Sequence, residues 1–236
     1  MTRSPLPRIT ILTGAGVSAE SGLGTFRDKG GMWQTHDLEA LATPEGYARN
    51  PGRVLAFYND RRAAAAEAAP NAAHHALARL VSAAPDRVHL VTQNVDDLHE
   101  RAGTPTLWHM HGELMRARCS DCGRSWPETG PLDLADRCRA CGAVGRLRPD
   151  VVWFGEIPRH LDEIADALSE TEVFVSIGTS GAVYPAAGFV AEASRHGADT
   201  LELNLERSDV SRLFEETRLG PATELVPAWV AEILGD

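Results

Sequence analysis

The chain has 236 residues, of which 43% are hydrophobic and 24% charged, and its formal net charge is −10 at pH 7. This length allows a sizeable core in one large domain together with a small insert, and the composition is typical of a soluble globular protein. The negative charge argues against direct binding to nucleic-acid backbones, which requires a basic surface.

The N-terminal part of the chain predicts a strand followed by a glycine-rich turn. Residues 1–8 hold no apolar run of the kind a secretory signal needs, and no later stretch approaches the roughly 18 apolar residues that span a bilayer. We therefore expect a cytoplasmic protein with no membrane partner. A buried strand is predicted over residues 8–13, and it runs directly into the glycine-rich residues 14–22. This order opens a dinucleotide-binding βαβ unit, although it also suits a tight turn in any α/β protein.

The glycines of this turn have a specific use. Gly14 and Gly16, with Ala19 in the third place of the motif, let the backbone approach a pyrophosphate at a helix N-terminus without an intervening Cβ. An ordinary NAD-dependent oxidoreductase would place an acidic residue at the end of a second strand about 20 residues further on. Residues 21–33 instead form a polar, glycine-punctuated loop, which argues against hydride transfer and for a functional loop beside the cofactor.

The later elements alternate between helices and strands. Helices are predicted over residues 53–69 and 71–83, with Asn71 as the N-cap of the second. Further strands are predicted over residues 87–92, 106–111, 172–177 and 200–204, and further helices over residues 186–195 and 226–234. This alternation predicts an α/β fold, a Rossmann-like parallel sheet with helices on both faces. Residues 1–116 and 149–236 would form this NAD-binding domain, and residues 117–148 a small zinc-binding insert.

All four cysteines lie in the predicted insert. Cys119 and Cys122 form one C-x₂-C pair, Cys138 and Cys141 form a second, and 15 residues separate the pairs. In a reducing compartment this spacing indicates one tetrahedral Zn²⁺ site with no open position, so the metal is structural. A nucleic-acid-binding ribbon is the alternative use of the pattern, and the net charge of −10 disfavours it.

A series of motifs along nearly the whole chain carries a family resemblance. In order they are residues 14–22 with Thr25-Phe26-Arg27, residues 92–96, residues 109–112, the two C-x₂-C pairs, and residues 152–156, 178–180 and 204–206. In this order they resemble the motifs of the sirtuins, which are NAD-dependent protein deacylases. Gly24 departs from the pattern, because many relatives carry a basic residue or proline there. A glycine adds flexibility to the cofactor loop.

The resemblance implies a reaction in which the acyl-lysine carbonyl oxygen attacks C1′ of the nicotinamide ribose and nicotinamide leaves. A general base then activates a ribose hydroxyl, and water releases free lysine and 2′-O-acyl-ADP-ribose. An imidazole that is neutral near pH 7 suits this role, and the resemblance assigns it to His111. The residues alone do not distinguish His111 from His109, since both would lie on one face of the predicted strand. A packed or zinc-associated histidine is the alternative for either.

Polar residues follow the predicted strands, where open parallel sheets bind their ligands. The resemblance assigns Asn94 and Asp96 to the nicotinamide pocket, as catalytic residues beside His111, and Gln93 to the ribose. Capping of the next helix is the alternative, above all for Asp97. The cofactor-binding residues that the resemblance implies are Gly14, Ala15, Gly16, Ser18, Ala19, Glu20, Thr25, Phe26, Arg27, Trp33, Gln93, Asn94, Asp96, Gly178, Thr179, Ser180, Asn204, Leu205, Glu206 and Ala222.

The acylated peptide is expected to bind along residues 152–156. By resemblance, Val152, Phe154 and Gly155 belong to an exposed edge with which the peptide pairs as an added strand. A plain apolar strand packed on the core is the alternative, and Trp153 suits either interpretation. We expect acyl-lysine proteins as partners and a monomeric enzyme.

A pair of residues on a predicted helix bears on the acyl group. Tyr58 and Arg61 are three residues apart and therefore share a face, where a phenol and a guanidinium can together hold a carboxylate. The sirtuin branch that removes succinyl and malonyl groups carries this Tyr-x-x-Arg pair, and Ala42 matches its small residue, which makes room for a longer acyl chain. A solvated helix face is the alternative for Arg61 and Arg62. We therefore expect desuccinylase and demalonylase activity with residual deacetylase activity.

Other functions compete with this hypothesis. The chain could act mainly as a deacetylase or as a mono-ADP-ribosyltransferase, which shares the NAD cleavage but uses a different acceptor. It could also be an NAD-dependent oxidoreductase, or a zinc-ribbon interaction module with vestigial catalysis. The presence of Asn94, Asp96 and His111 together argues against the last of these.

Overall fold

The computed structural model describes residues 6–24 and 38–236. Its larger sheet has the strand order β3-β2-β1-β7-β8-β9, and all of its strand pairs are parallel. The strands are β1 (Ile9–Thr13), β2 (Val88–Thr92), β3 (Trp108–His109), β7 (Val173–Ile177), β8 (Asp199–Asn204) and β9 (Glu216–Leu219). The predicted α/β fold with a Rossmann-like parallel sheet is confirmed.

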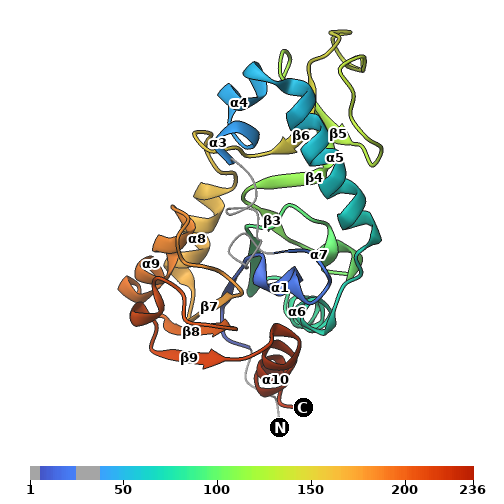
Figure 1. Cartoon of the computed structure of the whole chain (residues 1–236). Helices are drawn as coiled ribbons and strands as arrows, with labels where there is room; N and C mark the ends of the chain where they lie inside the picture. The colour runs from blue at the N-terminus through green and yellow to red at the C-terminus, as the bar shows by residue number, and fades with distance from the viewer. Residues whose placement is uncertain (1–5, 25–37) are drawn as a thin grey trace.

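Helices cover both faces of this sheet (Figure 1). They are α6 (Ala72–Ala83) and α10 (Ala222–Leu234) on one face, and α8 (Leu161–Glu170) and α9 (Phe189–Arg195) on the other. Ile9 and Ile11 pack toward the first pair and Leu12 toward the second. Because both faces are buried, the central strands β1 and β7 are nearly continuous apolar runs, whereas the outer strands β8 and β9 also contain charged residues.

A smaller antiparallel sheet with the order β5-β4-β6 lies at the other end of the molecule (Figure 1). Its strands are β4 (Gly112–Cys119), β5 (Ser125–Pro127) and β6 (Leu147–Val151). Three helices lie beside it, α3 (Leu38–Leu41), α4 (Pro44–Arg49) and α5 (Pro51–Glu67). Strand β4 begins at Gly112 and β6 ends at Val151, so the small sheet extends on both sides beyond residues 117–148.

The structure corrects the prediction for residues 106–111. Strand β3 contains only Trp108 and His109, and the chain then turns, so His111 lies beyond the strand. Met110 is fully buried, and Gly112, which has a φ of 80°, begins β4. The expectation that His109 and His111 share one face of a strand is therefore wrong.

At the N-terminal ends of α6 and α10, side chains accept hydrogen bonds from the first backbone N–H groups and so set where each helix begins. Helix α6 has Asn71 as its N-cap, as predicted, and the Asn71 side chain accepts hydrogen bonds from two backbone N–H groups. Helix α10 begins at Ala222, four residues earlier than predicted, because the Glu20 carboxylate accepts hydrogen bonds from the backbone and the hydroxyl of Thr223 at 3.0 and 2.7 Å. A partner 203 residues away is not visible in the local sequence.

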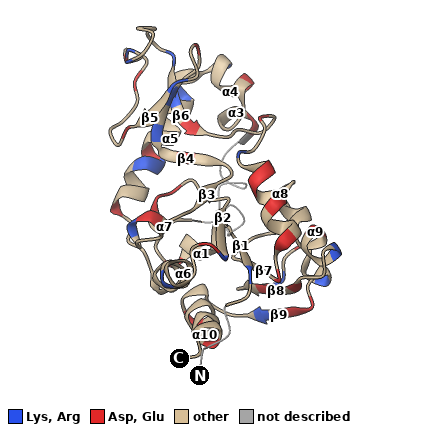
Figure 2. Ribbon diagram, turned by 180° about the vertical axis from the view of Figure 1, so that it is seen from behind, with Lys and Arg blue, Asp and Glu red and all other residues tan. Residues whose placement is uncertain are grey.

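Helix α8 was not predicted, and it is strongly amphipathic. Ile164, Ala167 and Leu168 are buried against the sheet, while acidic residues occupy its outer face, as Figure 2 shows. This face contributes to the negative charge of the chain. Within the described residues, no helix has the length and apolarity that crossing a membrane requires.

Candidate functional site

The larger sheet has a topological switch point between β1 and β7. Strand β1 is followed outward by β2 and β3, whereas β7 is followed in the opposite direction by β8 and β9. Loops that leave β1 and β7 therefore separate, and open α/β sheets bind ligands in the crevice formed there. The turn at Gly14 follows β1, Gly178 follows β7 and Asn204 ends β8, so the structure brings these predicted cofactor residues to one edge.

The glycines of two turns pack backbone against backbone at this edge. A Cβ on Gly14 would lie 2.8 Å from the Gly178 carbonyl oxygen, and one on Gly16 would lie 2.7 Å from the Gly178 Cα. Gly178 has a φ of +62°, and its own Cβ would lie 2.5 Å from the Val17 nitrogen. Glycine is thus required by the contact between the turns, in addition to any approach of a ligand. Helix α1 (Gly16–Ala19) spans only four residues. The backbone N–H groups of Gly14, Gly16 and Gly178 already donate to backbone carbonyls, whereas within the described residues those of Ala15, Thr179 and Ser180 have no acceptor.

Other predicted cofactor residues line the same edge. The Asn204 side chain donates a hydrogen bond to the Thr179 carbonyl oxygen at 2.7 Å, which links the loops after β7 and β8. Leu205 and Glu206 are exposed beyond them, and Ala222 begins α10. Glu20 is occupied by its bonds to Thr223. The predicted residues Thr25, Phe26, Arg27 and Trp33 lie outside the described residues.

A buried network centred on Ser18 joins the glycine-rich turn to the end of β2. Ser18 Oγ lies 3.2 Å from Asn94 Nδ2, 3.2 Å from Asp96 Oδ2 and 3.3 Å from His74 Nε2. Because His74 Nδ1 accepts the Asn71 N–H, neutral His74 carries its proton on Nε2 and donates it to Ser18. Ser18 can then donate to Asp96. Burial lowers the pKa of His74 to about 4 and raises the pKa of Asp96.

The side chain that caps the next helix belongs to Asp96 and not to Asp97. Asp96 Oδ1 accepts the backbone N–H of Leu98 at 3.2 Å at the start of α7 (Leu98–Arg101), whereas the Asp97 side chain makes no capping bond. Asp96 therefore has one oxygen on the helix start and the other on Ser18. This arrangement fixes the carboxylate at the edge of the sheet.

The structure distinguishes the two histidines that the sequence left equivalent. His109 is 7% exposed, and both of its ring nitrogens face oxygens, Nδ1 the Asn94 carbonyl at 3.1 Å and Nε2 the Glu100 carboxylate at 2.6 Å. His111 Nδ1 lies 3.2 Å from the Gln93 carbonyl oxygen, and within the described part of the chain Nε2 has no hydrogen-bond partner. A carbonyl only accepts, so Nδ1 of His111 carries the proton and Nε2 holds a free lone pair. Of the two histidines, His111 is therefore the one with a ring nitrogen that can accept a proton.

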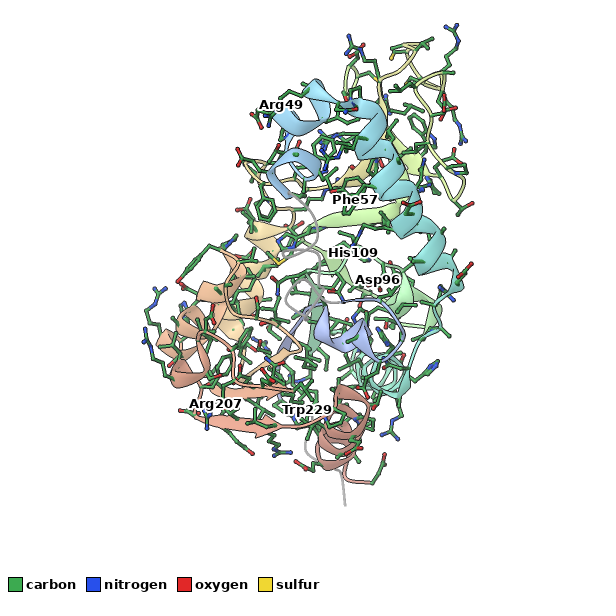
Figure 3. The ribbon with its side chains drawn as sticks, in the orientation of Figure 1. Arg49, Phe57, Asp96, His109, Arg207 and Trp229 are labelled. Carbon is green, nitrogen blue, oxygen red and sulfur yellow. The ribbon has the colours of Figure 1, made fainter. Side chains whose placement is uncertain are left out.

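Electrostatics separate the two rings further. Burial lowers the pKa of His111, and the bond to Gln93 offsets this only in part. Burial also lowers the pKa of His109, but the hydrogen bond and charge of Glu100 outweigh it, and the pKa is raised overall. Figure 3 shows His109 and Asp96 in the middle of the molecule, between the two sheets.

The residues predicted to contact the acyl group belong to one cluster on the small-sheet side. Tyr58 is 6% exposed and packs with Trp153, and Ala42 packs against the same cluster. The Trp153 indole N–H donates to Tyr58 Oη at 2.9 Å. Burial raises the pKa of Tyr58 to about 12, so the phenol stays protonated. Arg61 is half-buried, its guanidinium lies 5.7 Å from the Phe57 ring centre, and its charge interacts with Tyr58 and Asp96.

The alternative of a solvated helix face is wrong for Arg62. This residue is 2% exposed, and its guanidinium donates to the backbone carbonyls of Leu114, Glu128 and Gly130. Asn59, on the same side of α5, exchanges two hydrogen bonds of 2.9 Å with the backbone of Leu132. Asn59 and Arg62 therefore tie helix α5 to the cysteine-bearing segment, and Tyr58 lies one helical turn before Arg62.

Residues 152–156 form a tight turn rather than a free edge. Four of the five backbone N–H groups already have acceptors: Val152 donates to the His111 carbonyl, Phe154 to the Ala42 carbonyl, Trp153 to the Glu156 carboxylate, and Glu156 to the Trp153 carbonyl. Phe154 and Gly155 are exposed, and Trp153 is buried. A peptide that pairs here would use the remaining backbone groups.

The four cysteines fit one tetrahedral metal ion. Their sulfur atoms all lie within 4.8 Å of one another, and the pairs Cys119–Cys141 and Cys122–Cys138 are 3.8 and 3.7 Å apart. A Zn–S distance of about 2.3 Å in a tetrahedron gives S···S separations of roughly 3.8 Å. The backbone N–H groups of Cys141 and Ala140 donate to Cys138 Sγ, and they lower the pKa of that thiol to about 6. The donor set suits structural zinc.

Sequence reasoning missed several residues that hold the site together. Glu100 and His74 orient the polar network, and Arg148 and Glu156 hold the Trp153 turn. The one sequence signal was at His74, the third residue after an Asn N-cap, where a side chain can bond back to the cap. The other contacts depend on the tertiary fold.

Comparisons with known proteins agree with this arrangement. The profile of the Sir2 family matches residues 14–185. A protein of Caulobacter vibrioides named NAD-dependent protein deacylase is 59% identical over 230 residues, 96% of this chain and 97% of that protein. A Salmonella typhimurium protein of the same name is 55% identical over 230 residues, 97% of this chain and 84% of that protein.

Solved structures of Sir2 homologues also resemble this chain. The structure of a mutant Sir2 homologue in complex with ADP-ribose has a TM-score of 0.89 and 36% sequence identity, and the match covers 96% of this chain and 92% of that chain. A Sir2 homologue in complex with NAD has a TM-score of 0.87 at 36% identity, over 96% of this chain and 89% of that chain.

Proposed function

The chain belongs to the Sir2 family, and on this premise we propose that it is an NAD-dependent protein-lysine deacylase that favours acyl groups ending in a carboxylate. Relatives that are 53–59% identical to this chain are named NAD-dependent protein deacylases, which supports the deacylase activity. The observation that carries the proposal is the free Nε2 of His111 beside the glycine-lined edge of the sheet. We further propose a monomeric, cytoplasmic enzyme whose partners are acylated proteins.

The edge of the sheet supplies the groups that would hold NAD. Bound NAD contributes an electrophilic ribose carbon and nicotinamide as a leaving group. The turns that contain Gly14 and Gly178 would bind the pyrophosphate through the backbone N–H groups of Ala15, Thr179 and Ser180, which have no acceptor within the described residues. Asn204 to Glu206 with Ala222 would bind the adenosine end. Asn94 and Asp96, oriented by Ser18, would bind the nicotinamide end.

His111 would act as the general base. Its Nδ1–H is directed at the Gln93 carbonyl, which fixes the tautomer and leaves Nε2 to take a proton from a ribose hydroxyl. Because burial lowers its pKa, the ring is neutral near pH 7. His109 cannot serve, since both of its nitrogens are engaged.

Tyr58 and Arg61 would select the acyl group. The phenol is protonated and able to donate, and the guanidinium keeps its charge although burial lowers its pKa. A succinyl or malonyl carboxylate would accept hydrogen bonds from both side chains, whereas an acetyl group has no carboxylate to offer them. Sites built around a polar contact discriminate strongly against analogues that lack it.

The test compares succinyl-, malonyl- and acetyl-lysine peptides of one sequence by nicotinamide release. We expect Arg61→Met to lower kcat/KM for the two acidic acyl groups about 10- to 100-fold more than for acetyl, as expected for a charged hydrogen bond. Arg53→Met, an exposed arginine of the same helix, is the control and should change neither. Equal losses on all three peptides contradict the acidic pocket.

The same assay separates the other functions. A zinc-ribbon interaction module would release no nicotinamide, and an oxidoreductase would change the cofactor absorbance near about 340 nm. An ADP-ribosyltransferase would label protein without releasing free lysine. The proposed deacylase releases nicotinamide only when an acylated lysine is present.

A further inference from the structure

The hydrogen bond between Trp153 and Tyr58 has a defined direction. An indole N–H can only donate, so at 2.9 Å the Tyr58 oxygen is the acceptor. A phenol has a single proton, and within the described residues the structure gives that proton no acceptor. It therefore points away from Trp153. Because burial raises the pKa of Tyr58 to about 12, the proton is present throughout the physiological range.

This direction matters for a carboxylate ligand. A carboxylate only accepts hydrogen bonds, so Tyr58 helps to bind it only when the phenol donates. If an acceptor occupied the place of the Trp153 nitrogen, the Tyr58 proton would be used there. The phenol would then present lone pairs to the carboxylate and repel it.

The indole is held rigidly in this orientation. The Arg148 guanidinium lies 4.0 Å from the centre of the Trp153 ring, and it pairs with Glu156 at 2.6 Å. The other Glu156 oxygen accepts the Trp153 backbone N–H at 2.8 Å. The Tyr47 ring packs on the indole at 5.3 Å between ring centres. Arg148 and Trp153 are both buried, so the stack is shielded from water.

The same turn contacts two other parts of the site. The Val152 N–H donates to the His111 carbonyl at 2.8 Å, and the Phe154 N–H donates to the Ala42 carbonyl at 2.9 Å. Trp153 thus lies between the general base and the small residue of the acyl pocket. Of these contacts only the hydrogen bond to Tyr58 is made by the Trp153 side chain. A change in the orientation of the indole would therefore alter that bond first.

We propose that Trp153 is a positioning residue that determines acyl selectivity, because its indole N–H occupies the acceptor side of Tyr58 Oη and directs the Tyr58 proton toward a carboxylate-bearing acyl group. This inference rests on the acidic acyl pocket proposed above. It assigns to Trp153 a role in choosing the acyl group rather than in binding the peptide backbone.

The test measures the ratio of kcat/KM for succinyl- and acetyl-lysine peptides. Trp153→Phe keeps an aromatic ring under Arg148 but removes the N–H donor, and we expect it to lower the ratio about three- to tenfold, the value of one neutral hydrogen bond. Trp229→Phe removes an indole N–H from another buried tryptophan, on α10 far from this turn, and should leave the ratio unchanged (Figure 3). In a Tyr58→Phe background, Trp153→Phe should have no further effect on the ratio.

The outcomes separate this inference from the proposed function. If the wild type prefers succinyl-lysine and Arg61→Met removes that preference, the acidic pocket stands. An unchanged ratio in Trp153→Phe, or an equal fall in the Tyr58→Phe background, then overturns the role of Trp153 alone. If the wild type shows no succinyl preference, the acidic pocket fails and the inference fails with it.

A spectroscopic measurement on the wild type keeps the test valid if Trp153→Phe does not fold. A phenol that donates to a carboxylate becomes a better acceptor, because linked hydrogen bonds polarise one another. We therefore expect succinyl-lysine peptide to move the Trp153 indole N–H proton resonance downfield and acetyl-lysine peptide to move it less. An identical response to both peptides would overturn the inference.

Discussion

His109 and His111 lie two residues apart, but the pKa values of their rings are shifted in opposite directions. The carboxylate of Glu100, 2.6 Å from His109 Nε2, favours the imidazolium, whereas within the described residues the His111 ring bonds to the Gln93 carbonyl alone and burial favours its neutral form. His109 donates through Nδ1 to the Asn94 carbonyl, so the charged ring fixes the backbone at a proposed catalytic residue.

This relationship predicts a bell-shaped pH profile for kcat/KM. Activity should rise as pH increases through the lowered pKa of His111, below the usual value of about 6.5, because only the neutral ring is a base. It should fall as pH passes the raised pKa of His109, where the cation is lost. The cavity beside His109 and Glu100 is also lined by Glu113, Arg159 and His160. Their charges also affect the fall in activity at high pH, the alkaline limb of the profile.

Glu100→Gln tests the alkaline limb. Removing the carboxylate lowers the pKa of His109, so the limb should move to lower pH while the acid limb stays in place. Glu67→Gln, an exposed residue at the end of α5, is the matched control. An alkaline limb that does not move would show that it arises from another group.

His111→Ala should abolish nicotinamide release without loss of the fold. Among the described residues the His111 side chain makes one hydrogen bond, to Gln93, so its removal costs little stability. The contact with Val152 is made by the His111 backbone and is kept. Bound zinc, measured by elemental analysis, should remain at one ion per chain. Turnover comparable to that of the wild type would exclude His111 as the base.

Arg62→Met should destabilise the protein strongly. It leaves the buried carbonyl of Leu114 and the half-buried carbonyl of Gly130 without this donor, at a cost of about 3 kcal/mol in the free energy of unfolding. Urea denaturation measures this, with the exposed Arg53→Met as control. Because Arg62 ties α5 to the cysteine-bearing segment, chelation of zinc should also be faster in the variant. Equal chelation rates would argue against this coupling.

Because His74 is buried, we expect the free energy of unfolding to decrease in acid. Its pKa is about 4 in the folded protein, because it is buried, and about 6.5 when unfolded, so the unfolded state binds more protons between these values. The stability is complete above pH 6.5 and falls as pH drops toward 4, by about 3 kcal/mol. His74→Gln should flatten this fall in urea titrations at pH 7 and 5. His75→Gln, its exposed neighbour on α6, should flatten the fall less, because burial lowers the pKa of His74 more than the charge of His75 does.

Much of the fold could be predicted because the signals are local. Apolar strands, the glycine-rich turn, the Asn71 cap and the cysteine spacing each reflect chemistry within a few residues. The shared face of Tyr58 and Arg61 followed from helical periodicity, and their expected place in an acyl pocket from the family resemblance. Helix α8 also carries a local signal, because Ile164, Ala167 and Leu168 recur at helical spacing beside acidic residues, and it could have been predicted.

The parts that could not be predicted depend on contacts between distant segments. The choice between His109 and His111 depends on Glu100 and on the turn that ends β3. The burial of Arg62 depends on carbonyls 52 to 68 residues away. The start of α10 depends on Glu20. In each case a polar side chain forms a hydrogen bond that the neighbouring sequence does not indicate.

The contact between Gly14, Gly16 and Gly178 has a consequence for how the chain can be divided. Each turn occupies the space where a side chain of the other would be, so neither turn keeps its shape by itself. A fragment that stops before β7 would lack the surface that shapes its first loop. The two halves of the sheet must therefore come together before a dinucleotide has anywhere to bind, and a split version of this enzyme should gain its cofactor site only on reassembly.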